Sequence, residues 1–289
     1  MKSLFKTLSH YSLLLLLIPT LGCSDAMDDL PFEYIDVAGL ERNFALFVPE
    51  NVPEEPMPLL VAFHGGGMMY EEFPQQVAFQ SLAESEGFII AYPRGYNFPD
   101  NEGSWQLNTA EGRTHDVEFV RAMVDRISGR YSIDASRIYS TGYSLGSMYN
   151  YEVLCHMSDI FAASASYAGT MPMEPADCNP ARFAPVMHIH GADDGIISYS
   201  ETWGWKAWDE VGEMMNIPGL VEYWSNKYNC QETADTATDS STHTVHSSCD
   251  QEVRVEHHRI EGLDHGWPSD INGTSTHQVI WTFLSEFSL

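Results

Sequence analysis

The chain has 289 residues, of which 14 are lysine or arginine and 41 are aspartate or glutamate, so its formal net charge is −27. This acidic balance argues against nucleic acid and anionic surfaces as partners. The length suits one α/β domain with a sizeable core, and no apolar run after the first 22 residues is long enough to be a membrane span.

The first 22 residues have the features of an export signal. Two lysines precede a short apolar core at residues 13–18, and a glycine stands before Cys23. This ending is similar to the lipobox of bacterial lipoproteins, in which the cysteine is lipidated, although Thr20 stands where leucine is usual. We predict a signal peptide over residues 1–22 and a tether over 23–31. Ordinary cleavage nearby, with Cys23 a free thiol, is the alternative.

The remaining chain alternates between patterns typical of strands and of helices. Apolar or β-prone runs predict strands at residues 32–37, 42–48, 59–63, 88–92, 137–141, 185–190 and 253–260. Helical spacing or context predicts helices at residues 77–85, 117–127, 148–154 and 277–287. We expect the tryptophan-rich stretch 199–229 to be helical covering and the polar stretch 233–248 to be an exposed loop. The alternation predicts an α/β fold, a doubly wound and mostly parallel sheet with helices on both faces.

Four cysteines follow Cys23, and an even number in an exported chain favours disulfides. Three pairings are possible. We favour Cys155–Cys178 and Cys230–Cys249, because each pair closes a local loop. A zinc site is the alternative, but the cysteines are far apart and no Cys-x-x-Cys occurs.

Residues 142–146 read Gly-Tyr-Ser-Leu-Gly and stand where a predicted strand meets a predicted helix. A tight turn there would expose the Ser144 hydroxyl, and Gly142 and Gly146 would avoid side-chain clashes in that turn. The pattern predicts a serine hydrolase with the α/β-hydrolase fold, whose single catalytic domain covers residues 32–289.

A serine nucleophile needs a histidine base and a carboxylate that orients the histidine. In α/β-hydrolases these follow in the order serine, acid, histidine. Asp193 and Asp194 follow a predicted strand, and His265 lies in a turn-rich loop after the last predicted strand. We predict that Ser144 and His265 are catalytic. The residues alone leave the choice between Asp193 and Asp194 open.

Ester hydrolysis also needs donors for the developing oxyanion. The amide of Leu145, directly after the serine, is one candidate. The second is expected from the loop His64-Gly65-Gly66-Gly67, which follows an apolar strand. We favour Gly66 over Gly65. The alternative is that these glycines form only a flexible turn.

Several motifs in the same order resemble the polyhydroxybutyrate (PHB) depolymerase-like esterases, which are related to the feruloyl and acetylxylan esterases of carbohydrate esterase family one. The resemblance runs from about residue 32 to 287, with motifs at residues 63–65, 91–95, 116–120, 137–144, 158–163, 190–194 and 265–268. It implies that Asp194 is the acid and His265 the base, and that the favoured cysteine pairs are family disulfides. The chain departs from the family at His115 and Ser147, where aspartate and glycine are common.

The sequence therefore predicts an exported serine esterase that needs no cofactor and no metal and forms an acyl-enzyme. Feruloyl or acetyl esters of plant polysaccharide are the favoured substrates, and Trp105 and Trp203 are candidates to stack on them unless they pack the core. The pair His188-x-His190 resembles metal ligands, but its strand should be buried. The alternatives are a polyhydroxyalkanoate or polyester depolymerase and a non-catalytic binding protein on the same fold.

Overall fold

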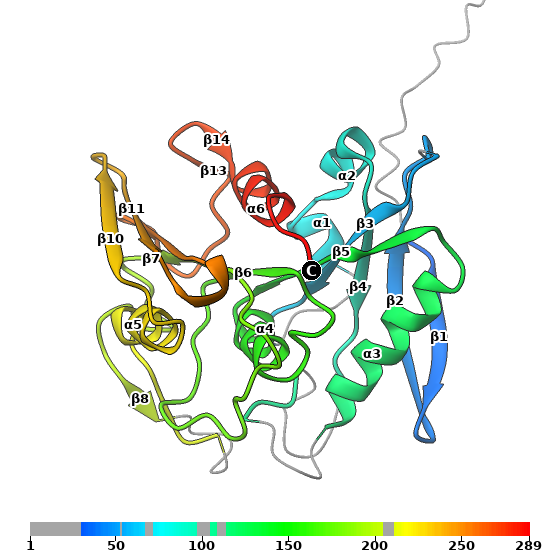
Figure 1. Cartoon of the computed structure of the whole chain (residues 1–289), viewed down its shortest axis with the longest axis horizontal. Coiled ribbons are helices and arrows are strands. Elements are labelled where there is room, and N and C mark those ends of the chain that lie inside the picture. The colour runs from blue at the N-terminus through cyan, green and yellow to red at the C-terminus, as the bar shows by residue number, and fades with distance from the viewer. Residues whose placement is uncertain (1–29, 53, 67–71, 97–104, 109–113, 205–210) are drawn as a thin grey trace, which may run out of the picture.

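The computed structural model describes residues 30–52, 54–66, 72–96, 105–108, 114–204 and 211–289. The predicted leader with Cys23, and also Gly67, lie outside these residues. Within them, one sheet of ten strands has the order β1-β2-β4-β3-β5-β6-β7-β12-β11-β10 (Figure 1). Its strands are β1 Phe32–Val37, β2 Leu40–Phe47, β3 Met57–Phe63, β4 Ile89–Pro93, β5 Ile133–Tyr143, β6 Ala163–Tyr167, β7 Val186–Gly191, β10 Glu232–Ala237, β11 Ser241–Ser247 and β12 Val255–Ile260.

The centre of the sheet is parallel and its two margins are antiparallel. The run β4-β3-β5-β6-β7-β12 is parallel, while β1, β2, β11 and β10 pair antiparallel. All residues of β3, β4, β6 and β7 are buried, as expected for parallel strands that are covered on both faces. The predicted α/β class with a mostly parallel central sheet is confirmed.

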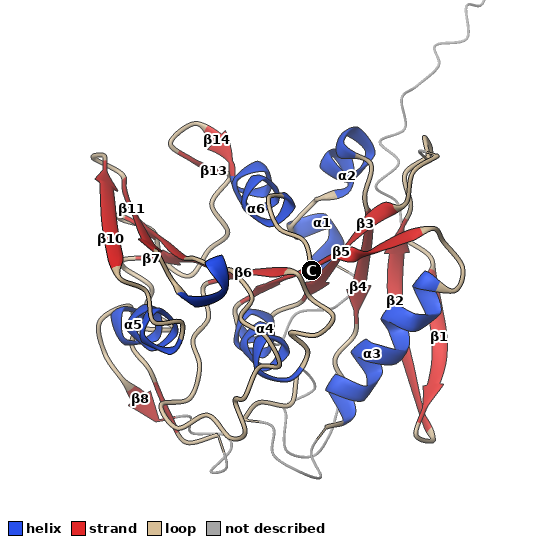
Figure 2. Ribbon diagram, in the orientation of Figure 1, coloured by secondary structure: helices blue, strands red, loops and turns tan. Residues whose placement is uncertain are grey.

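Six α-helices among the described residues cover both faces of the sheet (Figure 2). They are α1 Phe73–Gln76, α2 Gln80–Glu86, α3 His115–Ser128, α4 Leu145–His156, α5 Ile217–Lys227 and α6 Thr276–Ser285. α3, α4 and α5 pack in one apolar core, and α1, α2 and α6 pack in a second core on the other face. Strand β3 supplies both, because Leu59 and Val61 face the first core while Leu60 and Ala62 face the second.

Three short elements complete the described fold. The 3₁₀ helix η1 covers Asp250–Glu252. Two small sheets join β8 (Trp203–Gly204) to β9 (Glu213–Met214), and β13 (Asp270–Ile271) to β14 (Thr274–Ser275).

Strand β6 was not predicted from the sequence, and two predicted segments have a different structure. Residues 233–248 are not a loop, because most of them form the antiparallel hairpin β10–β11 at the margin of the sheet. Every residue of β10 is exposed, so the strand lacks the alternation of apolar residues that identifies a half-buried strand, and backbone pairing to β11 holds it in place. The stretch 199–229 is helical only in α5 and contributes β8 and β9 before it.

Both predicted disulfides are present. Cys155, near the end of α4, bonds to Cys178 in the loop that follows β6. Cys230 and Cys249 are bonded to each other at the open end of the β10–β11 hairpin. In the described part of the chain, no helix has both the length and the apolar character that a membrane span requires.

Candidate active site

Ser144 occupies a strained turn between β5 and α4. Its backbone has φ 53° and ψ −120°, a conformation that residues other than glycine rarely adopt. Its amide donates to the Tyr167 carbonyl on the neighbouring strand at 2.9 Å. A Cβ at Gly142 would lie 2.3 Å from the Gly146 carbonyl oxygen, and one at Gly146 would lie 2.2 Å from the Phe63 carbonyl oxygen. The two glycines therefore allow the close approach that this turn requires.

His265 lies between the serine hydroxyl and a carboxylate. Its Nε2 is 2.9 Å from Ser144 Oγ, and its Nδ1 is 2.7 Å from Asp194 Oδ2. An ionised carboxylate can only accept, so it selects the tautomer in which Nδ1 carries the proton. Nε2 is then free to accept the proton of the serine hydroxyl.

Asp194, and not Asp193, is the acid that faces His265. Asp193 is exposed, while Asp194 is only 6% exposed. The second oxygen of Asp194 accepts the amides of Ile196 and Ile197 at 2.9 and 2.8 Å. Burial opposes the charge on Asp194, but hydrogen bonds from His190, His265 and the Ile197 amide outweigh burial and hold its pKa well below the ordinary value.

A buried chain of hydrogen bonds continues behind Asp194. His190 Nε2 lies 3.2 Å from Asp194 Oδ2 and 2.9 Å from the Ile197 carbonyl, so this nitrogen must carry a proton. His190 Nδ1 is 3.0 Å from His188 Nε2, and His188 Nδ1 is 2.7 Å from the Tyr151 hydroxyl. With Nε2 donating and Nδ1 accepting in both rings, each group from Tyr151 to His190 donates toward Asp194. Burial, and then the neighbouring histidines, hold the pKa of His188 well below its usual range.

The loop that carries His265 is held by hydrogen bonds to the segments of Gly195 and Tyr143. The Asp264 carboxylate accepts the amides of His265 at 2.7 Å and of Gly195 at 2.9 Å. This contact joins the loop after β12 to the loop after β7. Tyr143, the residue before the serine, donates its hydroxyl to the His265 carbonyl at 3.1 Å. These contacts fix the backbone of His265 relative to both Ser144 and Asp194.

Gly66 packs against the side chain of Leu145, the residue that follows Ser144. A Cβ at Gly66 would be 3.0 Å from Leu145 Cδ2. Leu145 is the first residue of α4, so its amide has no acceptor within the helix. The two residues proposed to supply the oxyanion donors are thus in contact.

His64 holds the backbone that leads to Gly66. Burial lowers the pKa of His64 to about 4, so the ring is neutral. Its Nε2 accepts the Gly95 amide at 2.9 Å, and Nδ1 therefore donates to the Gly65 carbonyl at 2.9 Å. Because a trans peptide points its N–H opposite to its C=O, this bond turns the Gly66 amide away from the His64 ring. The Trp105 indole donates to the His64 carbonyl at 2.8 Å.

The structure corrects the expectation that Trp105 contacts substrate. Its side chain is fully buried, stacks on Tyr149 with centroids 4.8 Å apart, and has its indole nitrogen bonded to His64. Trp203 is half-buried on β8. The β8–β9 unit is joined to the loop after β6, where the Met173 amide donates to the Glu213 carbonyl at 2.8 Å. Since β5 and β6 are parallel, that loop lies at the sheet edge that also carries Ser144.

Sequence reasoning missed the supporting roles of Tyr143, Tyr151, His188 and His190. The two histidines were identified as a pair on one face of a strand, and the structure shows that pair hydrogen-bonded in a line that ends at Asp194. Tyr143 stands inside the pentapeptide, so its proximity could have been expected. Tyr151 lies seven residues after Ser144, two helical turns along α4, and only the packing of α4 on the sheet brings it to His188.

The parallel sheet with helices on both faces, and a strained serine turn between β5 and α4, define the α/β-hydrolase class of esterases. The chain belongs to the esterase PHB depolymerase family, whose model matches residues 42–189.

Curated relatives carry esterase names. The chain is 25% identical over 264 residues to the bifunctional acetylxylan esterase/xylanase XynS20E of Neocallimastix patriciarum, covering 89% of this chain and 35% of that protein. It is 24% identical to feruloyl esterase B of Piromyces equi over 82% of this chain and 43% of that protein. A putative esterase, NocK, of Nocardia uniformis subsp. tsuyamanensis is 26% identical over 80% and 72% of the two chains. The chain thus spans less than half the length of the acetylxylan esterase/xylanase and of the feruloyl esterase.

Solved structures show the same fold. The acetyl xylan esterase from Aspergillus awamori superposes with a TM-score of 0.64 and 15% identity, covering 88% of this chain and 99% of that one. A thermostable esterase superposes with a TM-score of 0.59 and 18% identity, covering 91% and 64% of the two chains. At these identities the likeness is one of fold.

Proposed function

We propose that this protein hydrolyses carboxylic esters through an acyl-enzyme on Ser144. The observation that carries the proposal is the line of hydrogen bonds from Ser144 Oγ through His265 to Asp194, at 2.9 and 2.7 Å. These are the distances at which a base accepts a proton from a nucleophile and a carboxylate orients the base. The esterase names of the relatives are consistent with this chemistry.

In the first half of the reaction, Ser144 Oγ attacks the ester carbonyl and its proton passes to His265 Nε2. The Asp194 carboxylate stabilises the imidazolium that forms. Collapse of the tetrahedral intermediate breaks the bond to the alcohol, which takes the proton from His265. In the second half, His265 removes a proton from water, the resulting hydroxide attacks the acyl-serine, and Ser144 is released with its proton restored.

The oxyanion of each tetrahedral intermediate would accept hydrogen bonds from the amides of Gly66 and Leu145. The N-terminus of α4 adds a favourable partial positive charge at the same point. His64 and Trp105 support this arrangement, because they fix the backbone on the N-terminal side of Gly66. The donors are thus set in place before a substrate arrives.

The proposed substrates are acetyl or feruloyl esters on plant polysaccharide, as in the names of two of the relatives. The half-buried Trp203 is proposed to contact the substrate from the β8–β9 unit. We also propose that the protein is exported, which the two disulfides support. Cys23 would then carry a lipid anchor, because its context is similar to a lipobox.

The test is hydrolysis of a panel of esters by the purified protein without its first 23 residues. The panel contains p-nitrophenyl acetate, methyl ferulate, acetylated xylan and a hydroxybutyrate oligomer. We expect turnover of acetylated xylan or methyl ferulate to be lost in Ser144→Ala and retained in Ser147→Ala, which removes the hydroxyl of a fully buried serine three residues further along the chain. Preference for the oligomer would identify a polyester depolymerase. No Ser144-dependent turnover would refute the esterase and favour a binding protein.

A further inference from the structure

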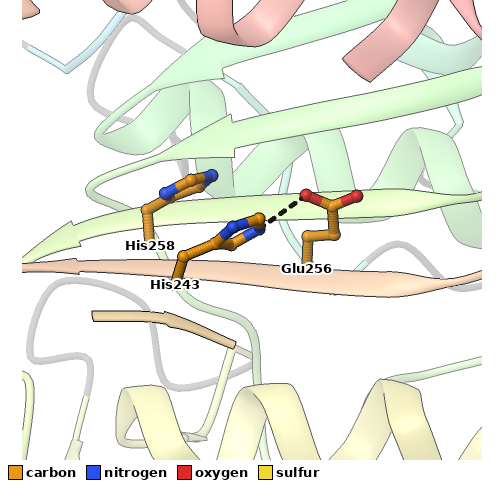
Figure 3. Close-up of side chains that lie close together, drawn as sticks. All are labelled: His243, Glu256 and His258. Carbon is orange, nitrogen blue, oxygen red and sulfur yellow. Dashed lines mark hydrogen bonds and ion pairs between the residues drawn. The ribbon is translucent and has the colours of Figure 1, made fainter. Parts of the chain in front are cut away.

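A second cluster of ionisable side chains lies on the strand pair β11–β12, away from Ser144. His243 on β11 is the direct antiparallel partner of His258 on β12, and Glu256 precedes His258 by two residues. Side chains at directly paired positions, and at positions two apart on a strand, project from the same face. Figure 3 shows all three side chains on that face of the two strands.

The three side chains lie close enough to share one ion. One nitrogen or oxygen atom from each of them falls within 4.8 Å of the others. His243 Nε2 is 2.8 Å from Glu256 Oε2, and the rings of His243 and His258 stack with centroids 4.0 Å apart and planes 8° from parallel (Figure 3). Two imidazoles and a carboxylate are a ligand set that proteins use for zinc and similar ions.

The environment of His258 is a second observation, independent of the cluster geometry, that points to a bound ion. Its side chain is only 7% exposed, yet neither Nδ1 nor Nε2 has a hydrogen-bond partner among the described residues. A buried polar group without a partner is costly, and such groups in native proteins usually mark an ion or a functional role. Burial lowers the pKa of His258 to about 4, so at neutral pH its ring is uncharged and has a lone pair to offer.

The charged neighbour Arg254 occupies one carboxylate oxygen of Glu256 and leaves the other for a metal ion. Arg254 pairs with Glu256 through Oε1, and also with Glu286 on α6 at 2.9 Å. Glu256 Oε2 faces His243. The pairing of Arg254 with two carboxylates compensates its charge, so the cluster is not left with an excess positive charge beside the incoming cation.

We propose that His243, Glu256 and His258 form a binding site for a divalent transition-metal ion such as Zn²⁺. A metal lies in the plane of each imidazole that binds it, so the two parallel rings cannot both bind as they stand. His243 is the ring that turns, because its side chain is 32% exposed while His258 is held by burial. Turning it also frees Glu256 Oε2 for the ion, and water would complete a tetrahedral shell.

The ligand chemistry predicts the selectivity of the site. Imidazole nitrogens suit Zn²⁺, Cu²⁺ and Ni²⁺, whereas Mg²⁺ and Ca²⁺ prefer shells made of oxygen. The bound ion would cross-link β11 to β12. The expected effect is therefore greater resistance to unfolding, with the ester chemistry left to the separate site at Ser144.

The experiment is calorimetric titration of ZnCl₂ into the whole protein, prepared without a histidine tag in a non-chelating buffer at pH 7.5. We expect one Zn²⁺ per chain, and a rise in Tm of about 5 °C when Zn²⁺ is present at a hundredfold excess over its Kd. Mg²⁺ and Ca²⁺ should give neither signal. His243→Ala and His258→Ala should weaken Zn²⁺ binding by about 100-fold or more, and Glu256→Gln should weaken it measurably.

Matched controls locate the ion. His246→Ala removes another histidine of β11, one that bonds Thr233 at 3.0 Å, and should leave Zn²⁺ binding unchanged. His265→Ala should also bind Zn²⁺ normally, which separates this site from the catalytic histidine. Absence of Zn²⁺ binding by the unaltered protein would overturn the proposal. So would unchanged binding in His243→Ala, a partly exposed position where loss of folding is not expected.

Discussion

Replacing Asp194 by asparagine should invert the hydrogen bond that orients His265. The oxygen of the new amide would stay on the side of Ile196 and Ile197, because both backbone amides donate there at 2.9 and 2.8 Å. Its NH₂ group would then face His265 Nδ1, which now sits 2.7 Å from Asp194 Oδ2. His265 must accept at Nδ1 and move its proton to Nε2. Facing Ser144, that protonated nitrogen cannot take the serine proton.

The size of the effect follows from the loss of the general base. We expect kcat on p-nitrophenyl acetate to fall by about 10⁴, which corresponds to about 5 kcal/mol of transition-state stabilisation, while KM changes little. Asp193→Asn is the matched control and should keep wild-type activity, because that carboxylate is exposed. Activity of Asp194→Asn within about tenfold of wild type would refute the assignment of Asp194.

Three further predictions concern stability. Tyr151→Phe removes the hydroxyl that donates to the buried His188, and it should lower the free energy of unfolding in urea by about 1–3 kcal/mol. Tyr149→Phe removes a hydroxyl that has no partner among the described residues, so it should lower the free energy of unfolding by less. Equal losses in the two variants would contradict the proposed chain of donors. The unfolded chain binds a proton at His64 below about pH 6.5, whereas the folded chain does so only near pH 4. The free energy of unfolding should therefore fall as the pH drops between these values. A free energy of unfolding that stays constant across this window would count against a neutral His64. Replacing both Cys230 and Cys249 by alanine should lower the free energy of unfolding by about 3 kcal/mol, because their disulfide restricts the unfolded chain. A change below about 0.5 kcal/mol would contradict this prediction.

The sequence was sufficient for the fold class and for the arrangement around the nucleophile. Continuous apolar runs such as residues 59–63 are typical of parallel strands that are buried on both faces, and β3 is such a strand. The pentapeptide around Ser144 predicts a tight turn, because the turn leaves no room for side chains at Gly142 and Gly146. Local chemistry of this kind can be read without knowledge of the tertiary structure.

Other features depend on contacts that are distant in the sequence. Strand β6 alternates alanine with serine before Tyr167 and has no continuous apolar run, and β10 is exposed throughout, so both are held by their neighbours in the sheet. A tryptophan such as Trp105 looks the same in sequence whether it stacks on a ligand or, as here, on Tyr149. The chain of donors from Tyr151 to Asp194 needs α4, β7 and the loop after β7 in place together.

The central claim is that Ser144 is a nucleophile activated by His265. The most direct test is to treat the purified protein with a fluorophosphonate and locate the adduct by peptide mass spectrometry. We predict one adduct, on the peptide that contains Ser144, with no labelling of Ser144→Ala and labelling of His265→Ala slowed by about 10³ or more. An unlabelled protein, or an adduct on a different residue, would contradict the claim.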